Sequence, residues 1–331
     1  MAKGQVFHVT EEYSHKTLAA ALRVWFPGKS WSEIRRWIHR RYVLVNGNVC
    51  QEEARRLRLQ DVVKVLERPV PREPAPEDVR VVHWDAHLCV VEKPPGINST
   101  RHEDELVGRV QWQPCLTELL PRILKHLDPR LRSLRSWPPV FPVHRLDRQT
   151  GGLMVFARTR SAQHDLAAQF RAHTIHRVYW AIVHGCPENQ TIETYLVRDR
   201  GDGRRGSSPK PGEGRRAVTH VEVLERIGPY CVVACRLETG RTHQIRIHLS
   251  ELGHYICGET VYCKPLRGPV FRDRSGAPRL ALHAAELGFL HPKTRQPLYF
   301  KSSWPEDLAQ FLEALRQRCA QGNFDSRSQR T

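Results

Sequence analysis

The stretch from Pro142 to Ala157 places one carboxylate in a tight loop directly before a buried strand. Its sequence is Pro-Val-His-Arg-Leu-Asp-Arg-Gln-Thr-Gly-Gly-Leu-Met-Val-Phe-Ala. The apolar run that starts at Leu153 predicts a strand, and the Thr-Gly-Gly step before it predicts a turn. A strand end is rigid, so the loop can hold Asp147 in a fixed position. Taken alone, the pattern is more typical of an aspartate that caps a turn.

Two further stretches outweigh that structural interpretation. One is Glu-Thr-Gly-Arg-Thr-His-Gln-Ile-Arg-Ile-His-Leu at 238–249, and the other is His-Arg-Val-Tyr-Trp-Ala-Ile-Val-His-Gly at 176–185. Three shorter segments accompany them: Val-Glu-Lys-Pro-Pro-Gly at 91–96, Leu-Ala-Leu-His-Ala-Ala at 280–285 and Phe-Leu-His-Pro at 289–292. In this order and at these spacings, the segments resemble the motifs of the RluA-type pseudouridine synthases. The resemblance extends from about Leu88 to Leu312.

The resemblance implies an isomerase that converts uridine to pseudouridine within an RNA chain. The bond from C1′ to N1 breaks, the uracil turns in place, and C1′ joins C5. The implied fold is α+β, with a mixed or antiparallel sheet in the catalytic domain. The reaction needs no cofactor and no metal. The chain shows neither a phosphate-binding loop motif nor a dinucleotide fingerprint, and its cysteines and histidines lack zinc-site spacing.

By this resemblance, three residues carry the catalysis. Asp147 is the catalytic carboxylate: it can attack C1′ or take a proton from C2′, and both routes stay open. Because burial disfavours a charged carboxylate, a fixed cation is needed nearby. Arg246 fits that need and is expected to pair with Asp147 through both arms of its planar guanidinium. Tyr179 is the third residue, stacking on uracil and assisting proton removal from C5.

Two further arginines are expected to bind the substrate. A uridine held in a base stack cannot reach Asp147, so the nucleotide has to flip out. Arg145 lies two positions before Asp147 and can fill the space that the base leaves. Arg241 lies at the predicted start of a helix, where backbone amides and a cation together suit a phosphate.

The chain departs from the family pattern at three places. Glu259 stands where aspartate is common, Gly151 stands where serine is common, and the basic segment 199–214 is an unusual insertion. We expect the insertion to form a mobile surface loop. None of the three departures is expected to touch the proposed catalytic residues.

A small α+β unit over residues 14–68 precedes the catalytic domain. Its helix, strand, Asn-Gly turn and strand resemble the ribosomal-protein-S4-like RNA-binding domain. Arg41 and Gln60 stand where that family usually has glycine, which predicts unusual turns. The basic residues that suit RNA phosphates are Arg35, Arg36, Arg40 and Arg41. The alternative is a small module whose basic face is merely solvated.

The remaining organisation follows from composition and periodicity. A proline-rich linker spans 69–78, the catalytic domain spans 79–318, and 319–331 is expected to be a disordered tail. Strands are predicted near 79–92, 152–158, 177–185, 217–226, 230–238 and 280–290. Helices are predicted near 116–127, 161–173, 242–252 and 305–317.

Charge favours a polyanionic partner. The chain has 52 basic and 35 acidic residues among 331, a net charge of +17, and RNA is the expected partner. The large ribosomal RNA is the leading substrate, with transfer RNA as the alternative. A non-catalytic RNA-binding or ribosome-assembly protein is the second alternative, although such a protein would be free to lose Asp147. No membrane contact and no obligate protein partner are expected.

The nine scattered cysteines predict reduced thiols and a cytoplasmic location.

Overall fold

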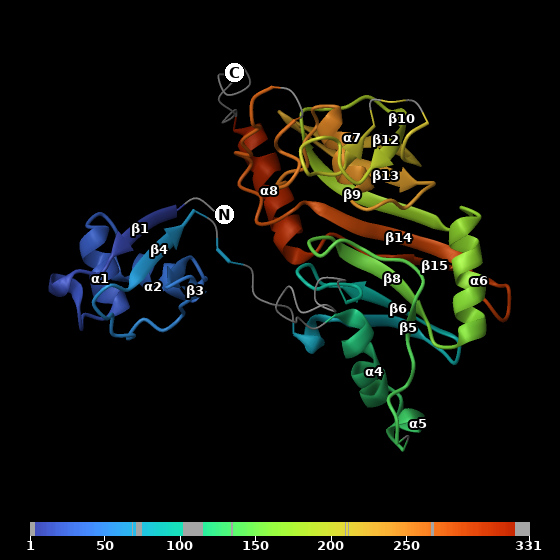
Figure 1. Cartoon of the computed structure of the whole chain (residues 1–331), viewed down its shortest axis with the longest axis horizontal. Coiled ribbons are helices and arrows are strands. Elements are labelled where there is room, and N and C mark those ends of the chain that lie inside the picture. The colour runs from blue at the N-terminus through green and yellow to red at the C-terminus, as the bar shows by residue number, and fades with distance from the viewer. Residues whose placement is uncertain are drawn as a thin grey trace. The chain divides into compact units, whose positions relative to one another are not determined.

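A computed structural model describes residues 4–67, 69–70, 75–101, 115–133, 135–208, 210, 212–265 and 268–321. The chain divides into two compact units, Met1–Glu73 and Pro74–Thr331 (Figure 1). The boundary between them lies inside the proline-rich segment 69–78. None of the described helices is long and apolar enough to cross a membrane.

The first unit packs two helices against a small antiparallel sheet. Its elements are β1 (Gly4–His8), a short turn of helix at Glu11–Tyr13, α1 (Leu18–Trp25), α2 (Trp31–His39), β2 (Val43–Val45), β3 (Asn48–Val49) and β4 (Val62–Leu66), and the strand order is β1-β4-β2-β3. Ser30 caps α2, since its hydroxyl accepts the Glu33 amide while the Glu33 carboxylate accepts the Ser30 amide. Because β1 pairs with β4 along its whole length, the unit begins earlier than the predicted residue 14.

Two turns of the first unit adopt the left-handed backbone conformation without glycine. Arg41, just after α2, has φ 66°, and Gln60, before β4, has φ 69°. The unusual turns that the sequence predicts therefore keep the geometry that glycine would give, at the cost of some backbone strain.

The second unit is built on one large mixed sheet. Its order is β11-β10-β12-β13-β9-β14-β8-β6-β5, with β15 added to β14 and β7 added to β8. The strands are β5 (Arg80–Trp84), β6 (Leu88–Lys93), β7 (Phe141–Pro142), β8 (Gly151–Ala157), β9 (His176–His184), β10 (Gln190–Val197), β11 (Gly206–Ser207), β12 (Arg215–Ile227), β13 (Tyr230–Leu237), β14 (Leu282–Leu290) and β15 (Pro297–Lys301). The pair β14–β8 is parallel, while the other described pairs of this sheet are antiparallel.

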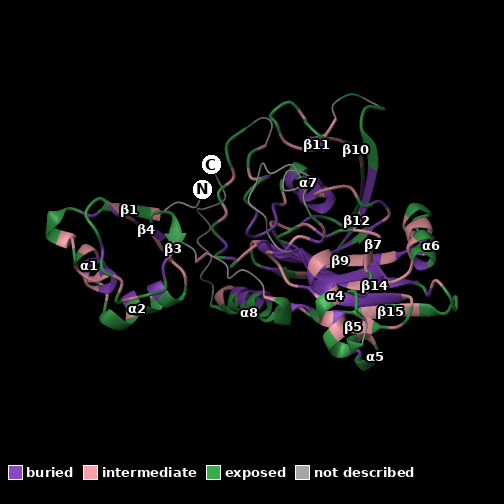
Figure 2. Cartoon of the chain, turned by 60° about the horizontal axis from the view of Figure 1, so that its bottom comes forward, coloured by how far each residue is buried: buried purple, intermediate pink, exposed green. Residues whose placement is uncertain are grey.

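Helices cover both faces of this sheet. They are α4 (Leu116–Leu127), α5 (Pro129–Arg132), α6 (Arg160–Arg171), α7 (Gln244–Glu251) and α8 (Glu306–Ala320), with a short turn of helix at Pro76–Asp78. Met154 of β8 belongs to the cluster that includes α4, α7 and α8, whereas Leu153 belongs to the cluster that includes α6. The central strands are accordingly the most buried part of the unit (Figure 2). The α+β class with a mixed sheet is confirmed.

The structure corrects two predicted segments. Helix α8 continues to Ala320, so the expected tail cannot start at 319, and residues 322–331 lie outside the described part. The insertion 199–214 contains β11, which pairs with β10. Its Ser207 gives a backbone and a side-chain hydrogen bond to Glu251 at the end of α7, 2.9 and 2.6 Å long. These bonds tie the insertion to the catalytic unit, contrary to the mobile loop that we expected.

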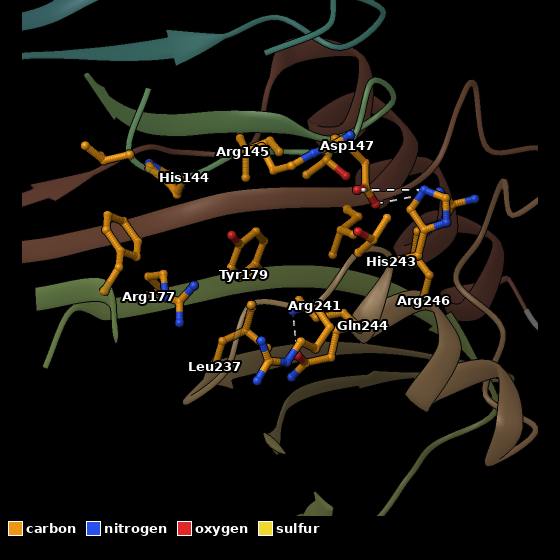
Figure 3. A pocket seen from close by; sticks show the side chains of 18 of the residues that line it. His144, Arg145, Asp147, Arg177, Tyr179, Leu237, Arg241, His243, Gln244 and Arg246 are labelled. Carbon is orange, nitrogen blue, oxygen red and sulfur yellow. Dashed lines mark hydrogen bonds and ion pairs between the residues drawn. The ribbon is translucent and has the colours of Figure 1, made fainter. Parts of the chain in front are cut away.

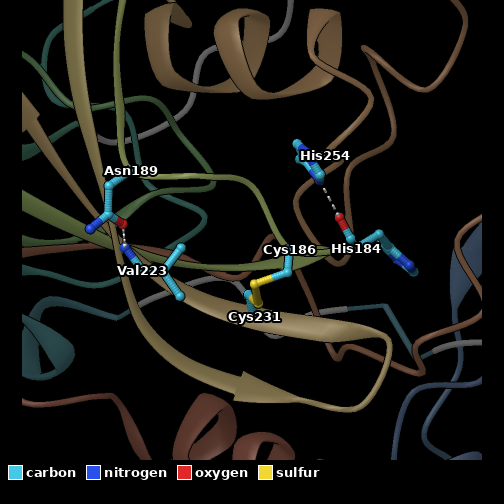
Figure 4. Close-up of a disulfide and its surroundings, with 6 residues drawn as sticks. All are labelled: His184, Cys186, Asn189, Val223, Cys231 and His254. Atoms are coloured by element: carbon cyan, nitrogen blue, oxygen red, sulfur yellow. Dashed lines mark hydrogen bonds between the residues drawn. A yellow bond between two sulfur atoms is a disulfide. The ribbon is translucent and has the colours of Figure 1, made fainter.

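The structure also corrects the expectation that all cysteines are reduced thiols. Cys186 follows β9 and Cys231 lies at the start of the neighbouring β13, and the two form a disulfide with a Cα–Cα distance of 5.3 Å (Figure 4). Adjacent antiparallel strands bring the two side chains within bonding range, a tertiary relationship that cysteine spacing alone does not reveal. Seven other cysteines are free thiols.

Candidate active site

Asp147 lies in the loop between β7 and β8, and this loop is fastened on both sides of it. The hydroxyl of the buried Ser99 donates to the Leu146 carbonyl and accepts the Leu146 amide, at 2.9 and 3.0 Å. On the other side, the Nζ of Lys93 donates to the Arg148 carbonyl at 3.1 Å. Since these anchors flank Asp147 directly, the carboxylate has a defined position.

Arg246, in the first turn of α7, faces Asp147 but does not form the two-armed pair that we expected. Its Nη1 lies 3.7 Å from Asp147 Oδ2, while its Nε and Nη2 each donate to Glu259 at 2.7 Å. The two-armed partner is therefore Glu259. The expectation that Glu259 touches none of the catalytic residues was wrong, because the turn that follows Gly258 returns to α7.

Glu259 is built to remain charged. It is buried, and it accepts backbone N–H groups of Thr260, Val261 and Tyr262 in addition to Arg246. Burial opposes its charge, but the hydrogen bonds from Arg246 hold the pKa of the Glu259 carboxyl below its ordinary value. Glu259 thus balances the charge of Arg246 and fixes the plane of the guanidinium.

His243 is a residue of this site that the sequence reasoning did not select. It caps α7 in the left-handed conformation, with φ 60°. Its Nε2 lies 3.8 Å from Asp147 Oδ1, and its Nδ1 is 2.7 Å from the Tyr262 hydroxyl. Burial lowers the pKa of His243, with Asp147 opposing that effect. The sequence feature that could have identified His243 is its position inside the 238–249 motif.

Tyr179 lies on β9 with its side chain buried in the same cavity. Its strand neighbours are Cys235 of β13 and Ala284 of β14. Burial raises the pKa of the Tyr179 phenol above its ordinary value, so the phenol stays protonated at neutral pH. The rigid centre of the sheet therefore positions a neutral hydroxyl beside the Asp147 loop.

These side chains line one cavity of about 480 Å³ (Figure 3). Ionisable groups from several elements line it, among them Asp147, Arg145, Arg177, Arg241 and Arg246. Apolar groups from the sheet, α6 and α7 line it too, among them Leu237, Ile245, Leu282 and Phe170. A cavity with one carboxylate, one phenol and apolar walls suits a planar base attached to a sugar.

A second, wider hollow of about 940 Å³ continues from this cavity and shares Arg145, Arg241 and His243 with it. We call this hollow the arginine groove. Among the described residues, its lining includes no carboxylate and six arginines: Arg101, Arg145, Arg198, Arg205, Arg215 and Arg241. Arg198 and Arg215 flank the insertion 199–214 and Arg205 belongs to it, so the insertion forms part of the groove wall. A groove with this composition attracts a polyanion.

The expected phosphate site at Arg241 takes a different form. The backbone amide of Arg241 donates to the side chain of Gln244 at 3.0 Å and is not free for a ligand. Its Nε donates to the Arg216 carbonyl at 3.0 Å. Arg241 therefore offers the rest of its guanidinium to the groove, without the backbone amide that we expected beside it.

The four arginines predicted for the first unit differ in their availability. Arg35 forms an ion pair with Glu53 at 3.1 Å, and the Nε of Arg41 donates to the Val70 carbonyl. Arg36 and Arg40 are exposed and have no partner within the described residues. Of the four, and as far as the described residues show, these two leave the whole guanidinium available to a phosphate.

Comparison with known proteins agrees with this geometry. Residues 87–251 match the RNA pseudouridylate synthase family. Among similar proteins is "Ribosomal large subunit pseudouridine synthase D" of Neisseria meningitidis serogroup A, 34% identical over 307 residues, which are 90% of this chain and 78% of that protein. A protein of the same name from Xanthomonas campestris is 33% identical over 321 residues, 94% of this chain and 92% of that protein.

A solved structure has the same fold. "Human RNA Pseudouridylate Synthase Domain Containing 4" aligns with a TM-score of 0.56 and 26% identity, over 72% of this chain and 93% of that one. The family match and the relatives of similar length place this chain among the RNA pseudouridine synthases, isomerases that act on uridine in RNA.

Proposed function

We propose that this enzyme isomerises uridine to pseudouridine in the large ribosomal RNA, with Asp147 as the catalytic carboxylate. The observation that carries the proposal is the position of Asp147, 3.7 Å from the guanidinium of Arg246 in the cavity that Tyr179 lines. The names of the bacterial relatives favour ribosomal RNA over the transfer RNA alternative.

The chemistry assigns one task to each residue. Asp147 attacks C1′ or removes a proton from C2′, and in both routes the electron pair of the C1′–N1 bond leaves with uracil. The uracil then turns and its C5 joins C1′, which breaks the bond to Asp147 in the first route or accompanies return of the proton to C2′ in the second. The proton on C5 then leaves and N1 gains one. Arg246 places a fixed positive charge 3.7 Å from Asp147, because a guanidinium does not lose its proton in proteins. Tyr179 stacks on the base and accepts a hydrogen bond or relays the proton that leaves C5.

The arginine groove is proposed to hold the RNA strand next to the flipped uridine. Arg145, which lines both hollows, fills the space that the base vacates, and Arg241 contacts a phosphate. Arg215 of β12 lies in the groove, while Arg226 of the same strand is exposed outside it. Arg215→Gln should lower the salt slope of RNA binding by about 0.7 for one single-strand phosphate contact. Arg226→Gln is the matched control, and equal slopes for both variants would contradict this path.

The substrate assignment is tested by mapping. Pseudouridines are mapped in total RNA from cells with and without the gene, and the purified protein is then given large ribosomal RNA and transfer RNA separately. The proposal predicts that sites disappear from the large ribosomal RNA and return when the protein is added. If pseudouridines disappear only from transfer RNA, the substrate is transfer RNA and the proposal of large ribosomal RNA is contradicted.

A further inference from the structure

Arg177 is a buried cation in the Asp147 cavity that lacks an acidic partner. It lies on β9, is 7% exposed, and lines the cavity. Its Nη2 donates to the backbone carbonyl of Glu238 at 3.0 Å, and its Nε is buried without a hydrogen-bond partner. Across the described chain it forms no ion pair. An uncompensated buried charge destabilises a fold, so a ligand that carries negative charge would explain its presence.

The surroundings of Arg177 make room for its charge without neutralising it. A Cβ at Gly240 would lie 2.8 Å from Nη1, so the glycine leaves space for the guanidinium. The ring of Phe170 lies 5.4 Å from it, a favourable distance for a cation beside an aromatic face. His144 stacks on Phe170 and accepts the Val155 amide. Burial, with Arg177 adding to it, lowers the pKa of His144 to about 3, which keeps that neighbour uncharged.

Tyr179 separates this cation from the catalytic carboxylate. Arg177 and Tyr179 are two positions apart on β9, so both side chains point to the same face of the sheet. Figure 3 shows Tyr179 between Arg177 on one side and Asp147 on the other. A uridine with C1′ at Asp147 and its base along Tyr179 would therefore direct a carbonyl oxygen of uracil toward Arg177.

We propose that Arg177 binds a carbonyl oxygen of the target uracil and stabilises the uracil anion that forms when the C1′–N1 bond breaks. This inference rests on the proposed function. In both routes open to Asp147, the electron pair of that bond departs with the base and spreads over N1, O2 and O4. A fixed donor with a positive charge in a partly enclosed cavity stabilises this charge most effectively in the transition state.

The same contact would select uracil over cytosine. Cytosine carries an amino group in place of O4. If the base is oriented with this position toward Arg177, the amino group of cytosine and the guanidinium are both hydrogen-bond donors and cannot pair. A site that leaves polar groups unpaired rejects such an analogue strongly. RNA with cytidine at the target position should bind more weakly to the wild type, and Arg177→Met should reduce this preference.

The test compares Arg177→Met and Arg177→Lys with the wild type in single-turnover assays. Arg177→Met should lower the rate by about 10²- to 10³-fold, the usual loss for one such donor, with little change in RNA affinity. Arg177→Lys should retain part of the rate because it keeps the charge. The deficit of both variants in breaking the C1′–N1 bond should shrink with 5-fluorouridine, since the electron-withdrawing fluorine makes the departing base less basic. The readout there is disappearance of the 5-fluorouridine nucleoside, because the analogue has no C5 proton to lose and cannot complete the reaction.

Thermal stability separates a functional from a structural role. Arg279→Met is the matched control, because Arg279 has a buried side chain that pairs with Asp307 and lies outside the cavity lining. Arg279→Met should lower the melting temperature, whereas Arg177→Met should leave it unchanged or raise it. If Arg177→Met does not fold, Arg177→Lys must still show the smaller deficit with 5-fluorouridine.

Two results would overturn the inference. A wild-type rate in Arg177→Met, or deficits of equal size with uridine and 5-fluorouridine, would show that Arg177 does not stabilise the departing base. Both results require an active wild type, so they contradict this inference alone. An inactive wild type on every RNA would contradict the proposed function and, with it, the inference.

Discussion

Arg246 donates to Glu259 from both Nε and Nη2 at 2.7 Å, and this pairing leaves Nη1 facing Asp147 at 3.7 Å. One guanidinium is therefore shared between a buried structural carboxylate and the proposed catalytic one. Because Glu259 is held by three backbone amides, the orientation of Arg246 depends on the turn after Gly258.

The Arg246–Glu259 pair should contribute to both stability and catalysis. Glu259→Gln removes the charge that compensates Arg246, and breaking one partner of a buried pair costs about 3–5 kcal/mol of unfolding free energy. The turnover rate should fall too, because the guanidinium loses its fixed plane. Urea denaturation and single-turnover rates measure the two effects.

Glu225→Gln is the matched control for this prediction. Glu225 forms a similar two-armed pair with Arg316, but on the surface. That substitution should cost at most about 1 kcal/mol and leave the rate unchanged. Equal losses for the two variants would show that the burial of the Arg246 pair has no special role.

His248 should make the fold sensitive to acid. Its Nδ1 and Nε2 contact the hydroxyls of Thr219 and Thr194 at 2.9 and 3.0 Å, and burial lowers its pKa to about 4. Between pH 4 and 6.5 the unfolded chain binds a proton that the folded chain does not. Stability should therefore fall as the pH drops through this range, by about 1.4 kcal/mol for each unit of pKa difference.

His248→Gln isolates this contribution. Glutamine can keep both hydroxyl contacts but does not titrate, so its unfolding free energy should fall less between pH 6.5 and 4 than that of the wild type. The measurement is urea denaturation at several pH values. Parallel curves for the two proteins would rule out His248 as a source of the acid sensitivity.

The first unit should add salt-dependent RNA affinity through Arg36 and Arg40. Replacing both with glutamine should reduce the salt slope of binding by about 1.4–1.8, since each phosphate contact contributes about 0.7–0.9. Arg23→Gln, on the neighbouring α1, is the control, because its guanidinium is engaged by the Pro27 carbonyl. An unchanged slope in the double variant would show that this face of the first unit does not bind RNA.

The sequence located much of the fold and of the site, but it did not reveal tertiary pairings. The strands β6, β8, β9, β13 and β14 all lie within or beside predicted segments, because apolar runs and turn residues mark buried strands. Asp147, Tyr179 and Arg246 line one cavity although 99 positions separate the first of them from the last. Their motifs identified them, whereas no local pattern indicates that they lie together.

The features that the sequence reasoning missed depend on the chain returning to itself. Glu259 meets Arg246 only because the turn after Gly258 folds back onto α7, and Cys186 meets Cys231 only because β9 and β13 are neighbours. His243 caps α7 in a left-handed conformation that residues of its type adopt infrequently. Helical periodicity, which assumes regular geometry, therefore gives no indication that His243 faces Asp147.

The role of Asp147 is tested most directly by Asp147→Asn, which keeps the shape of the side chain and removes its charge. The measurement is single-turnover conversion of uridine to pseudouridine, together with RNA affinity and melting temperature; Asp165→Asn on α6 serves as the control. The account predicts that Asp147→Asn folds, binds RNA almost as well as the wild type and forms no detectable pseudouridine, because phosphate contacts supply most of the affinity. Substantial pseudouridine formation by the folded variant would contradict the assignment of Asp147 as the catalytic carboxylate.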